Sequence, residues 1–375
     1  MSGNTVKVKN RPDYPLIIIV AILIIFGVLI LSSVSFIISQ ERFGTSFYYL
    51  NHQVLYGLIP GLILAYFSYK INLNLLKKWI PIFLLINLFF LILVFVPKFG
   101  LTSGGASRWV SLGPLSFQPS EFLKIIFILY LASWLESRTK LVKLSQPEKG
   151  FSQTLIAFLI ILFFISLILI YQPDASTLGI ILITATLMFF LAGTPLWHTL
   201  LIGLIGLGVL ILVVKIAPYR ANRIAVLFNP EADPMGIGYH LKNALIAVGS
   251  GGISGLGLGL SMQKFKFLPQ SISDSIFAIF AEETGFIGSF ILLLLCLIFF
   301  WRGFKIGKRS KDQFSRLTAF GITIWITLQT FFNIGSMIGI LPLSGIPLPF
   351  ISYGGSALIS ELIGVGILLN ISKQS

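Results

Sequence analysis

The sequence predicts an all-α integral membrane protein with about ten transmembrane helices, and its composition and its long apolar runs both indicate this class. Of the 375 residues, 56% are hydrophobic and only 11% are charged, whereas soluble domains carry about 25% charged residues. A spanning helix needs about 20 predominantly apolar residues. Ten stretches approach this length, at 15–38, 53–69, 79–97, 120–136, 152–171, 176–193, 196–215, 275–301, 317–341 and 349–371.

The distribution of Lys and Arg predicts the orientation, because cytoplasmic loops carry an excess of them. With the N-terminal tail, 1–14, in the cytoplasm, the inside segments carry 17 Lys and Arg residues and the outside segments carry 8. We therefore expect one polytopic domain over 1–375 in the cytoplasmic membrane, with both termini cytoplasmic. The loop 98–119 and one large loop, 216–275, between the seventh and eighth spans would face outward. Only 193–195 separates the sixth and seventh spans, and nine spans would place the termini on opposite sides.

The net charge of +14 follows from the same pattern. Basic residues beside a bilayer report topology and anionic lipid, so we expect membrane lipid and no nucleic acid as a partner.

Cys296 is the sole cysteine and lies in an apolar run, which excludes an intrachain disulfide and a Cys-rich metal site. The three histidines have no ligand spacing, and no metal ligands are predicted. Asp and Glu are then the acid–base candidates.

The large loop contains two contrasting segments. Apolar residues between Tyr239 and Val248 recur at the spacing of one helical face, which predicts an amphipathic helix at the membrane interface. The glycine-rich stretch 249–259 follows, and its composition favours a flexible connector.

Asp274 ends this loop, immediately before the span 275–301, and Glu282 and Glu283 follow inside that span. Carboxylates in or beside spanning helices are costly and are therefore candidates for function. The residues alone leave two interpretations of Asp274 open. It could cap the helix, which would lower its pKa and make it a poor base, or it could act as an acid–base group.

Four further polar residues lie at the predicted outer ends of spans. Glu121 and Lys124 are three apart on one helical face and can pair, either as a structural ion pair or as substrate contacts. Arg108 stands beside a tryptophan, and could hold an anionic headgroup or anchor the interface. Asp174 follows the fifth span and could simply cap the sixth helix.

The arginines Arg220 and Arg223 open the large loop, and they could be phosphate ligands or interfacial anchors. The segment 345–356 contains two prolines and paired glycines. Such broken backbone at membrane depth needs a protein-lined cavity to satisfy its polar groups. Glu361, further along this last helix, is expected to face the bundle interior.

Several of these residues stand in motifs that, in this order, resemble the RodA/FtsW/SpoVE (SEDS) family. The motifs are Arg108-Trp109, Gln118-Pro119-Ser120-Glu121-x-x-Lys124, Gln172-Pro173-Asp174, Tyr219-Arg220, Gly249-Ser250-Gly251-Gly252, Gln263-Lys264, Leu268-Pro269, Asp274-x-Ile276-Phe277-Ala278, Glu282-Glu283 and Gly345-Ile346-Pro347-Leu348-Pro349-Phe350-Ile351-Ser352-Tyr353-Gly354-Gly355-Ser356. The family usually has His-Thr-Asp where this chain has Ile272-Ser273-Asp274, so no histidine two residues earlier assists the carboxylate.

The resemblance implies a peptidoglycan glycosyltransferase that polymerises lipid II outside the cytoplasmic membrane, in cell division or elongation, with a class B penicillin-binding protein as partner. Asp274 occupies the family's catalytic aspartate position, and Glu121 and Lys124 match a polar pair near its central cavity. The segment from Gln263 to Pro269 looks more like the division branch than the elongation branch.

The implied reaction is inverting glycosyl transfer, with Asp274 as general base on the acceptor hydroxyl. Arg220, Arg223, Lys264 or Lys124 could stabilise the leaving lipid pyrophosphate, and the one candidate cofactor is a divalent cation, Mg²⁺ or Mn²⁺. The remaining substrate-binding candidates are Arg108, Glu121, Asp174 and Ser352. Two alternatives are a flippase for the lipid-linked precursor and a non-catalytic scaffold for a penicillin-binding protein. The concentration of charged motifs on the outer side favours the enzyme over the flippase.

Overall fold

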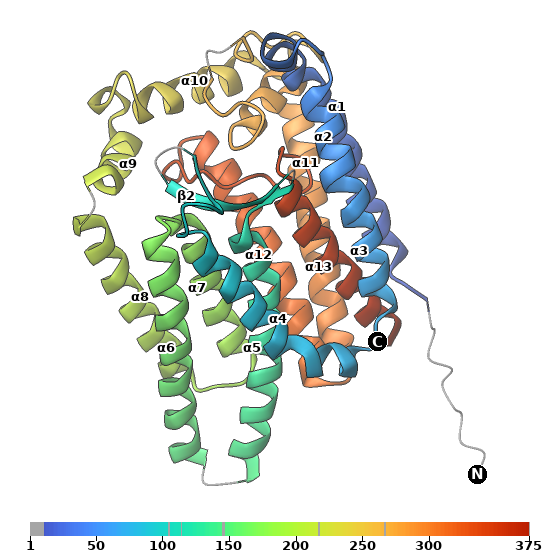
Figure 1. The fold of residues 1–375 in the computed structure, drawn as a ribbon, viewed down its shortest axis with the longest axis vertical. Helices are drawn as coiled ribbons and strands as arrows, with labels where there is room; N and C mark the ends of the chain where they lie inside the picture. Colours follow the sequence, from blue (N-terminus) through green and yellow to red (C-terminus); the bar gives the residue numbers. More distant parts are fainter. Residues whose placement is uncertain are drawn as a thin grey trace.

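The structure is a computed structural model that describes residues 11–103, 106–113, 115–144, 147–216, 218–265 and 268–374. It is a bundle of helices, most of them running along the long axis of the molecule (Figure 1). The predicted fold class is confirmed, because each of the ten predicted spans contains a helix over most of its length. Seven helices in the described parts of the chain are long and apolar enough to cross a membrane.

The first half of the bundle begins where Asp13 caps the first helix and accepts a hydrogen bond from the Leu16 N–H at 3.0 Å. Residues 1–10 of the predicted tail lie outside the described residues. The helices are α1 (Tyr14–Phe43), α2 (Tyr48–Gln53), the π-helical turn η1 (Val54–Leu58), α3 (Ile59–Lys70), α4 (Leu73–Leu93), α5 (Pro119–Leu144) and α6 (Pro147–Tyr171). The second predicted span is thus built from α2, η1 and α3.

The second half contains α7 (Ala175–Leu191), α8 (Leu196–Ile216), α11 (Ile276–Arg309), α12 (Gln313–Met337) and α13 (Gly355–Gln374). The sixth and seventh spans are separate helices, because the chain turns through Gly193 with a φ of 86°. The last helix begins later than the predicted residue 349. The prolines at 347 and 349 keep residues 345–354 out of the helix, and these residues form a non-helical loop instead.

A small antiparallel sheet in the predicted outer loop 98–119 was not anticipated from the sequence. Its strands are β1 (Gly100–Ser103), β2 (Ala106–Leu112) and β3 (Leu115–Phe117), in the order β1-β2-β3. Val110 in β2 pairs with Gly100 on one side and Phe117 on the other, and its side chain is fully buried. The sheet lies at the upper end of the bundle in Figure 1. The strands are too short for a clear alternating pattern.

The large loop folds into α9 (Pro218–Phe228), the 3-10 turn η2 (Pro230–Ala232) and α10 (Ile237–Ser250). The helix expected in this loop is present as α10, whereas α9 was missed, and the position of α10 at the membrane interface stays a prediction. Asp233 fixes the start of α10, since its carboxylate accepts hydrogen bonds from the N–H groups of Gly236 and Ile237 at 3.0 and 2.9 Å. Both helices lie at the same end as the sheet (Figure 1), which we call the loop end.

The glycine-rich stretch after α10 is not a flexible connector, and that interpretation was wrong. Helix α11 is broken at Gly285, which has φ 66° and ψ −163°. The freed backbone groups pair with residues 252–257: Leu256 N to Glu282 O (3.0 Å), Gly257 N to Glu283 O (3.0 Å), Phe286 N to Gly252 O (2.9 Å) and Ile287 N to Ile253 O (3.1 Å). A Cβ on Gly255 would lie 2.2 Å from the Glu283 carbonyl oxygen. Only glycine allows this close approach, so the stretch is an ordered part of the bundle.

Candidate active site

Asp274 lies at the loop end, between the start of α11 and the 345–354 loop. The N-cap of α11 is Ser275, and no side chain accepts a capping hydrogen bond there. The interpretation of Asp274 as a helix cap is therefore wrong. Its carboxylate is partly buried and faces the other loop, because a Cβ on Gly345 would lie 3.4 Å from Oδ2. The group is available for chemistry.

Two backbone contacts join the Asp274 turn to the loop that precedes α13. The Tyr353 N–H donates to the Ile272 carbonyl at 2.9 Å. The Ser352 hydroxyl donates to the Ser273 carbonyl at 2.6 Å and accepts from the Leu348 N–H at 2.7 Å. Ser352, a predicted substrate-binding residue, is thus buried and engaged with backbone on both sides. In this structure it holds the turn that carries the carboxylate.

Asn333 is a site residue that sequence reasoning missed. It is fully buried in α12, and its side-chain amide donates to the Asp274 carbonyl at 2.8 Å and to the Ile346 carbonyl at 2.7 Å. One side chain therefore holds both loops that flank the carboxylate. The signal in the sequence was weak, because a single Asn inside an apolar span can equally be a local helix contact.

His240 is a second residue that the sequence did not assign. Its Nε2 lies 2.6 Å from the Ser275 hydroxyl, which donates its proton to the Pro269 carbonyl at 2.8 Å. The hydroxyl must then accept from His240, which assigns the Nε2–H tautomer. Burial, followed by the positive charge of Arg223, lowers the pKa of His240 to about 4. A neutral histidine from α10 therefore supports the residue next to Asp274.

The surroundings of Asp274 make its carboxylate more basic than that of an ordinary aspartate. Burial raises its pKa to about 6, while a hydrogen bond with the Ser273 side chain and the charges of Arg223 and Arg108 oppose that rise. Arg223 donates to the Leu343 carbonyl at 3.0 Å, and Arg108 donates to the Gln172 carbonyl at 3.3 Å and to the Pro173 carbonyl. Backbone contacts thus hold two arginines near one carboxylate.

Asp174 caps α7 as expected, accepting from the Thr177 N–H at 3.3 Å and from the Ser120 hydroxyl at 2.9 Å. The predicted pairing of Glu121 with Lys124 is also present, with 2.8 Å between the carboxylate and Nζ. Asp174 and both paired side chains are buried. All three therefore have structural contacts, whatever further role they serve.

The Glu121–Lys124 pair continues as a buried chain of hydrogen bonds. Lys124 donates to Gln329 at 2.8 Å, and Gln329 donates to Glu361 at 3.1 Å. Glu361, which faces the interior as predicted, accepts from the Phe350 N–H at 2.9 Å. This chain links α5, α12 and α13 to the 345–354 loop, and so connects the pair to the loop that faces Asp274.

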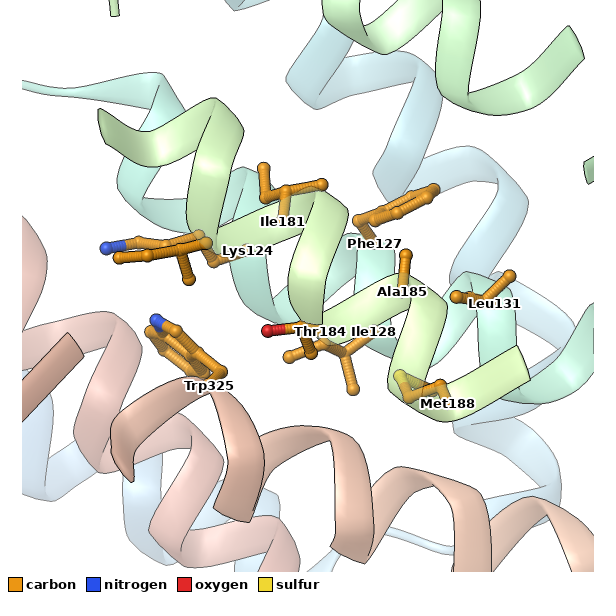
Figure 2. Close-up of a pocket in the computed structure, with 10 residues that line it drawn as sticks. Lys124, Phe127, Ile128, Leu131, Ile181, Thr184, Ala185, Met188 and Trp325 are labelled. Atoms are coloured by element: carbon orange, nitrogen blue, oxygen red, sulfur yellow. The ribbon is translucent and has the colours of Figure 1, made fainter. Parts of the chain in front are cut away.

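A narrow cavity lies beside this series of hydrogen bonds, between α5, α7 and α12 (Figure 2). Lys124 and Trp325 face each other, with the Thr184 hydroxyl directed to the same side, and the ammonium lies 5.4 Å from the Trp325 ring centroid. The cavity measures about 10 Å³, which is room for about one water molecule. It is too small for a sugar or a lipid headgroup.

Lys264 is not brought together with Asp274. It is buried, and its ammonium contacts Glu283 at 3.3 Å, the Gly259 carbonyl at 2.5 Å and the Ser33 hydroxyl at 3.3 Å. Glu282 accepts from the Met262 N–H at 3.0 Å. The two α11 carboxylates therefore hold the segment that follows the glycine-rich stretch.

Arg220 lies in α9, but its side chain falls outside the described residues. Within the described ranges, no group of three or more His, Cys, Asp and Glu side chains could hold a metal ion.

Together, the fold and the site define a polytopic membrane protein with one partly buried carboxylate, two nearby arginines and a buried polar network at its loop end. The chain belongs to the FtsW/RodA/SpoVE family: the family model described as cell cycle protein matches residues 14–375. The resemblance seen in the sequence motifs is thereby confirmed.

Relatives and solved structures agree over almost the whole chain. Stage V sporulation protein E of Bacillus subtilis is 38% identical over 98% of each chain. The probable peptidoglycan glycosyltransferase FtsW of Wigglesworthia glossinidia brevipalpis is 39% identical over 92% of this chain and 89% of its own. A solved peptidoglycan synthase complex that coordinates polymerization and crosslinking matches with a TM-score of 0.75 and 27% identity, covering 96% and 97% of the chains. Thermus thermophilus RodA matches with a TM-score of 0.69 and 26% identity, covering 99% and 98%.

Proposed function

We propose that this chain is a peptidoglycan glycosyltransferase that polymerises lipid II into glycan strands on the outer face of the cytoplasmic membrane. The observation that carries the proposal is the Asp274 carboxylate, partly buried, with a raised pKa, at a membrane-surface site flanked by two arginines. The names of the curated relatives support the activity. Those relatives are called FtsW or stage V sporulation protein E, which favours the division branch.

In the proposed reaction, Asp274 is the general base. It takes the proton of the acceptor GlcNAc 4-hydroxyl while that oxygen attacks the anomeric carbon of the donor MurNAc. A glycosidic C–O bond forms with inversion, and the C–O bond to the lipid pyrophosphate breaks. A base works best when its pKa lies near the working pH. With a pKa of about 6, Asp274 is mostly ionised at pH 7 and is more basic than an ordinary aspartate.

The leaving pyrophosphate requires positive charge, and we assign that role first to Arg108 and Arg223. Both lie close enough to Asp274 to affect its pKa, and a guanidinium suits phosphate oxygens. Arg220 remains a candidate from its position in α9. Lys124 and Lys264 are buried in ion pairs, so either would first have to leave its carboxylate. A divalent cation, if the reaction uses one, would supply further positive charge beside these arginines.

The partner we propose is a class B penicillin-binding protein, the transpeptidase that crosslinks the strands. Support comes from the similar solved complex, which couples polymerization to crosslinking. The outward orientation follows from the excess of Lys and Arg in the opposite loops. Substrate and partner would then meet at the loop end.

The test is lipid II polymerisation by the purified protein with its cognate transpeptidase, comparing wild type with Asp274→Asn. Glu231→Gln is the matched control, because it removes an exposed carboxylate from the same loop. We expect strands from wild type and control and a loss of about 10²–10⁴-fold in Asp274→Asn. Full activity in Asp274→Asn would refute the assignment of the base. Transport of the precursor without polymerisation by wild type would indicate a flippase, and function independent of any carboxylate would indicate a scaffold.

A further inference from the structure

A cavity of about 470 Å³ lies at the end of the bundle opposite Asp274, between the ends of α7, α11 and α12. Asp274 precedes α11, whereas Lys308 stands in its last turn. From the break at Gly285 to Arg309, α11 extends over roughly 35 Å at 1.5 Å per residue. The cavity is therefore separate from the proposed active site and lies at the far membrane surface.

The charged groups that line this cavity are cations. Lys308 and Arg316 contribute them and Gln313 adds an amide, whereas the described lining residues include no carboxylate. The carboxylate of nearby Asp312 is engaged in capping α12, where it accepts from the Ser315 N–H at 2.8 Å. The cavity therefore has a net positive charge and suits an anion.

Arg316 is the less exposed of the two cations, and it has no ion pair among the described residues. Its Nε is buried and has no hydrogen-bond partner within the described part of the chain. A buried donor without a partner destabilises the fold. By contrast, Arg302 at the same end is paired with Asp13. Because the Nε atom is closed to solvent, a phosphate in the cavity would contact the terminal nitrogens of the Arg316 guanidinium, which have no hydrogen bond within the described residues.

The surface leading to the cavity is apolar. Ile183, Leu187 and Leu191 are spaced four apart on α7, so they share one face of the helix. Ile183 and Leu187 are each 37% exposed, and Leu191 lines the cavity. An acyl chain could follow this face while its headgroup occupies the charged cavity. Free phosphate would use only the charged part.

We propose that this cavity binds the phosphate of an anionic phospholipid from the leaflet at that end, with Arg316 as the main ligand and Lys308 as the second cation. A guanidinium binds phosphate through two parallel N–H groups and is therefore the stronger ligand. Because the site is distant from Asp274, this proposal does not depend on the proposed reaction. With the predicted topology, the lipid comes from the cytoplasmic leaflet.

The experiment measures binding of dioleoyl phosphatidylglycerol to the purified full chain in detergent by native mass spectrometry, with dioleoyl phosphatidylcholine as the neutral lipid. The variants are Arg316→Gln, Arg316→Lys and Lys308→Gln. Arg309→Gln is the matched control, since it removes one exposed charge next to the cavity without altering its lining. Thermal unfolding establishes that each variant is folded.

We expect phosphatidylglycerol to bind at one site more tightly than phosphatidylcholine. Arg316→Gln should weaken that binding by about tenfold or more, as expected for loss of a hydrogen bond to a charged group, and Arg309→Gln should weaken it much less. Equal losses in both variants would show a diffuse basic surface and overturn the proposal. Displacement of the lipid by millimolar inorganic phosphate would show a free-anion site instead. If Arg316→Gln does not fold, unchanged binding in Lys308→Gln and Arg316→Lys would also overturn the proposal.

Discussion

The raised pKa of Asp274 predicts that polymerisation falls in mildly acidic solution. With a pKa of about 6, the ionised fraction drops from roughly 0.99 at pH 8 to roughly 0.1 at pH 5. An aspartate with the ordinary value of 3.8 would still be roughly 0.9 ionised at pH 5. A general base at Asp274 therefore predicts about a tenfold loss of rate over this range, whereas an unperturbed carboxyl predicts almost none.

The assay is kcat/KM for lipid II polymerisation between pH 5 and 8, because this parameter reports groups of the free enzyme and free substrate. Residual activity of Asp274→Asn should be flat over the range, whereas titration of the substrate would persist in that variant. His240, with a pKa of about 4, cannot produce a midpoint near 6. A wild-type kcat/KM at pH 5 that is at least half of its value at pH 8, or the same acidic limb in Asp274→Asn, would refute the reasoning.

The same pKa predicts the opposite effect on stability. A carboxyl whose pKa is raised on folding stabilises the fold only while protonated, so its contribution is present below pH 3.8 and is lost as the pH rises to about 6. The rise of the Asp274 pKa from 3.8 to about 6 corresponds to at most about 3 kcal/mol, and to less where water reaches the group. Asp274→Asn should therefore unfold at a higher temperature than wild type at pH 8, with little difference near pH 3.5. Lower stability at pH 8 would mean that the carboxylate supports the fold.

Three further predictions concern the surroundings of the site. His240→Leu removes the donor that supports the Asp274 turn and should lower kcat about fivefold, whereas His240→Gln can keep the donor and should retain most activity; equal kcat in both variants would argue against this role. Removing either Glu121 or Lys124 leaves a buried charge unpaired, at about 3–5 kcal/mol, so the Glu121→Gln/Lys124→Met double variant should unfold at a higher temperature than either single one. Gly255→Ala should abolish folded protein on size-exclusion chromatography because its Cβ would meet backbone at 2.2 Å, whereas Gly259→Ala, at a similar positive φ with no atom within 4 Å, should be milder by several kcal/mol.

The contrast at Gly255 illustrates what composition does not reveal. Both glycines belong to one stretch that reads as a connector, since nothing local separates a flexible glycine from one required by a close contact. The difference lies in α11, where the break at Gly285 exposes backbone groups that the stretch then satisfies. That pairing joins segments about thirty residues apart and is invisible to local patterns.

The sequence by itself determined the membrane class, the ten helical stretches, the helix in the large loop and the choice of Asp274, Arg108 and Arg223 as candidates for the site. These are local properties, because apolar length and helical spacing are read within one segment. The tertiary structure alone decided which polar groups meet. In the folded chain Asp274 does not cap α11, and Lys264 pairs with Glu283 instead of lying beside Asp274. His240 and Asn333 contact the turn that carries Asp274. Such contacts depend on how distant helices pack, and burial at the packed position, rather than residue type, is what raises the pKa of the carboxylate.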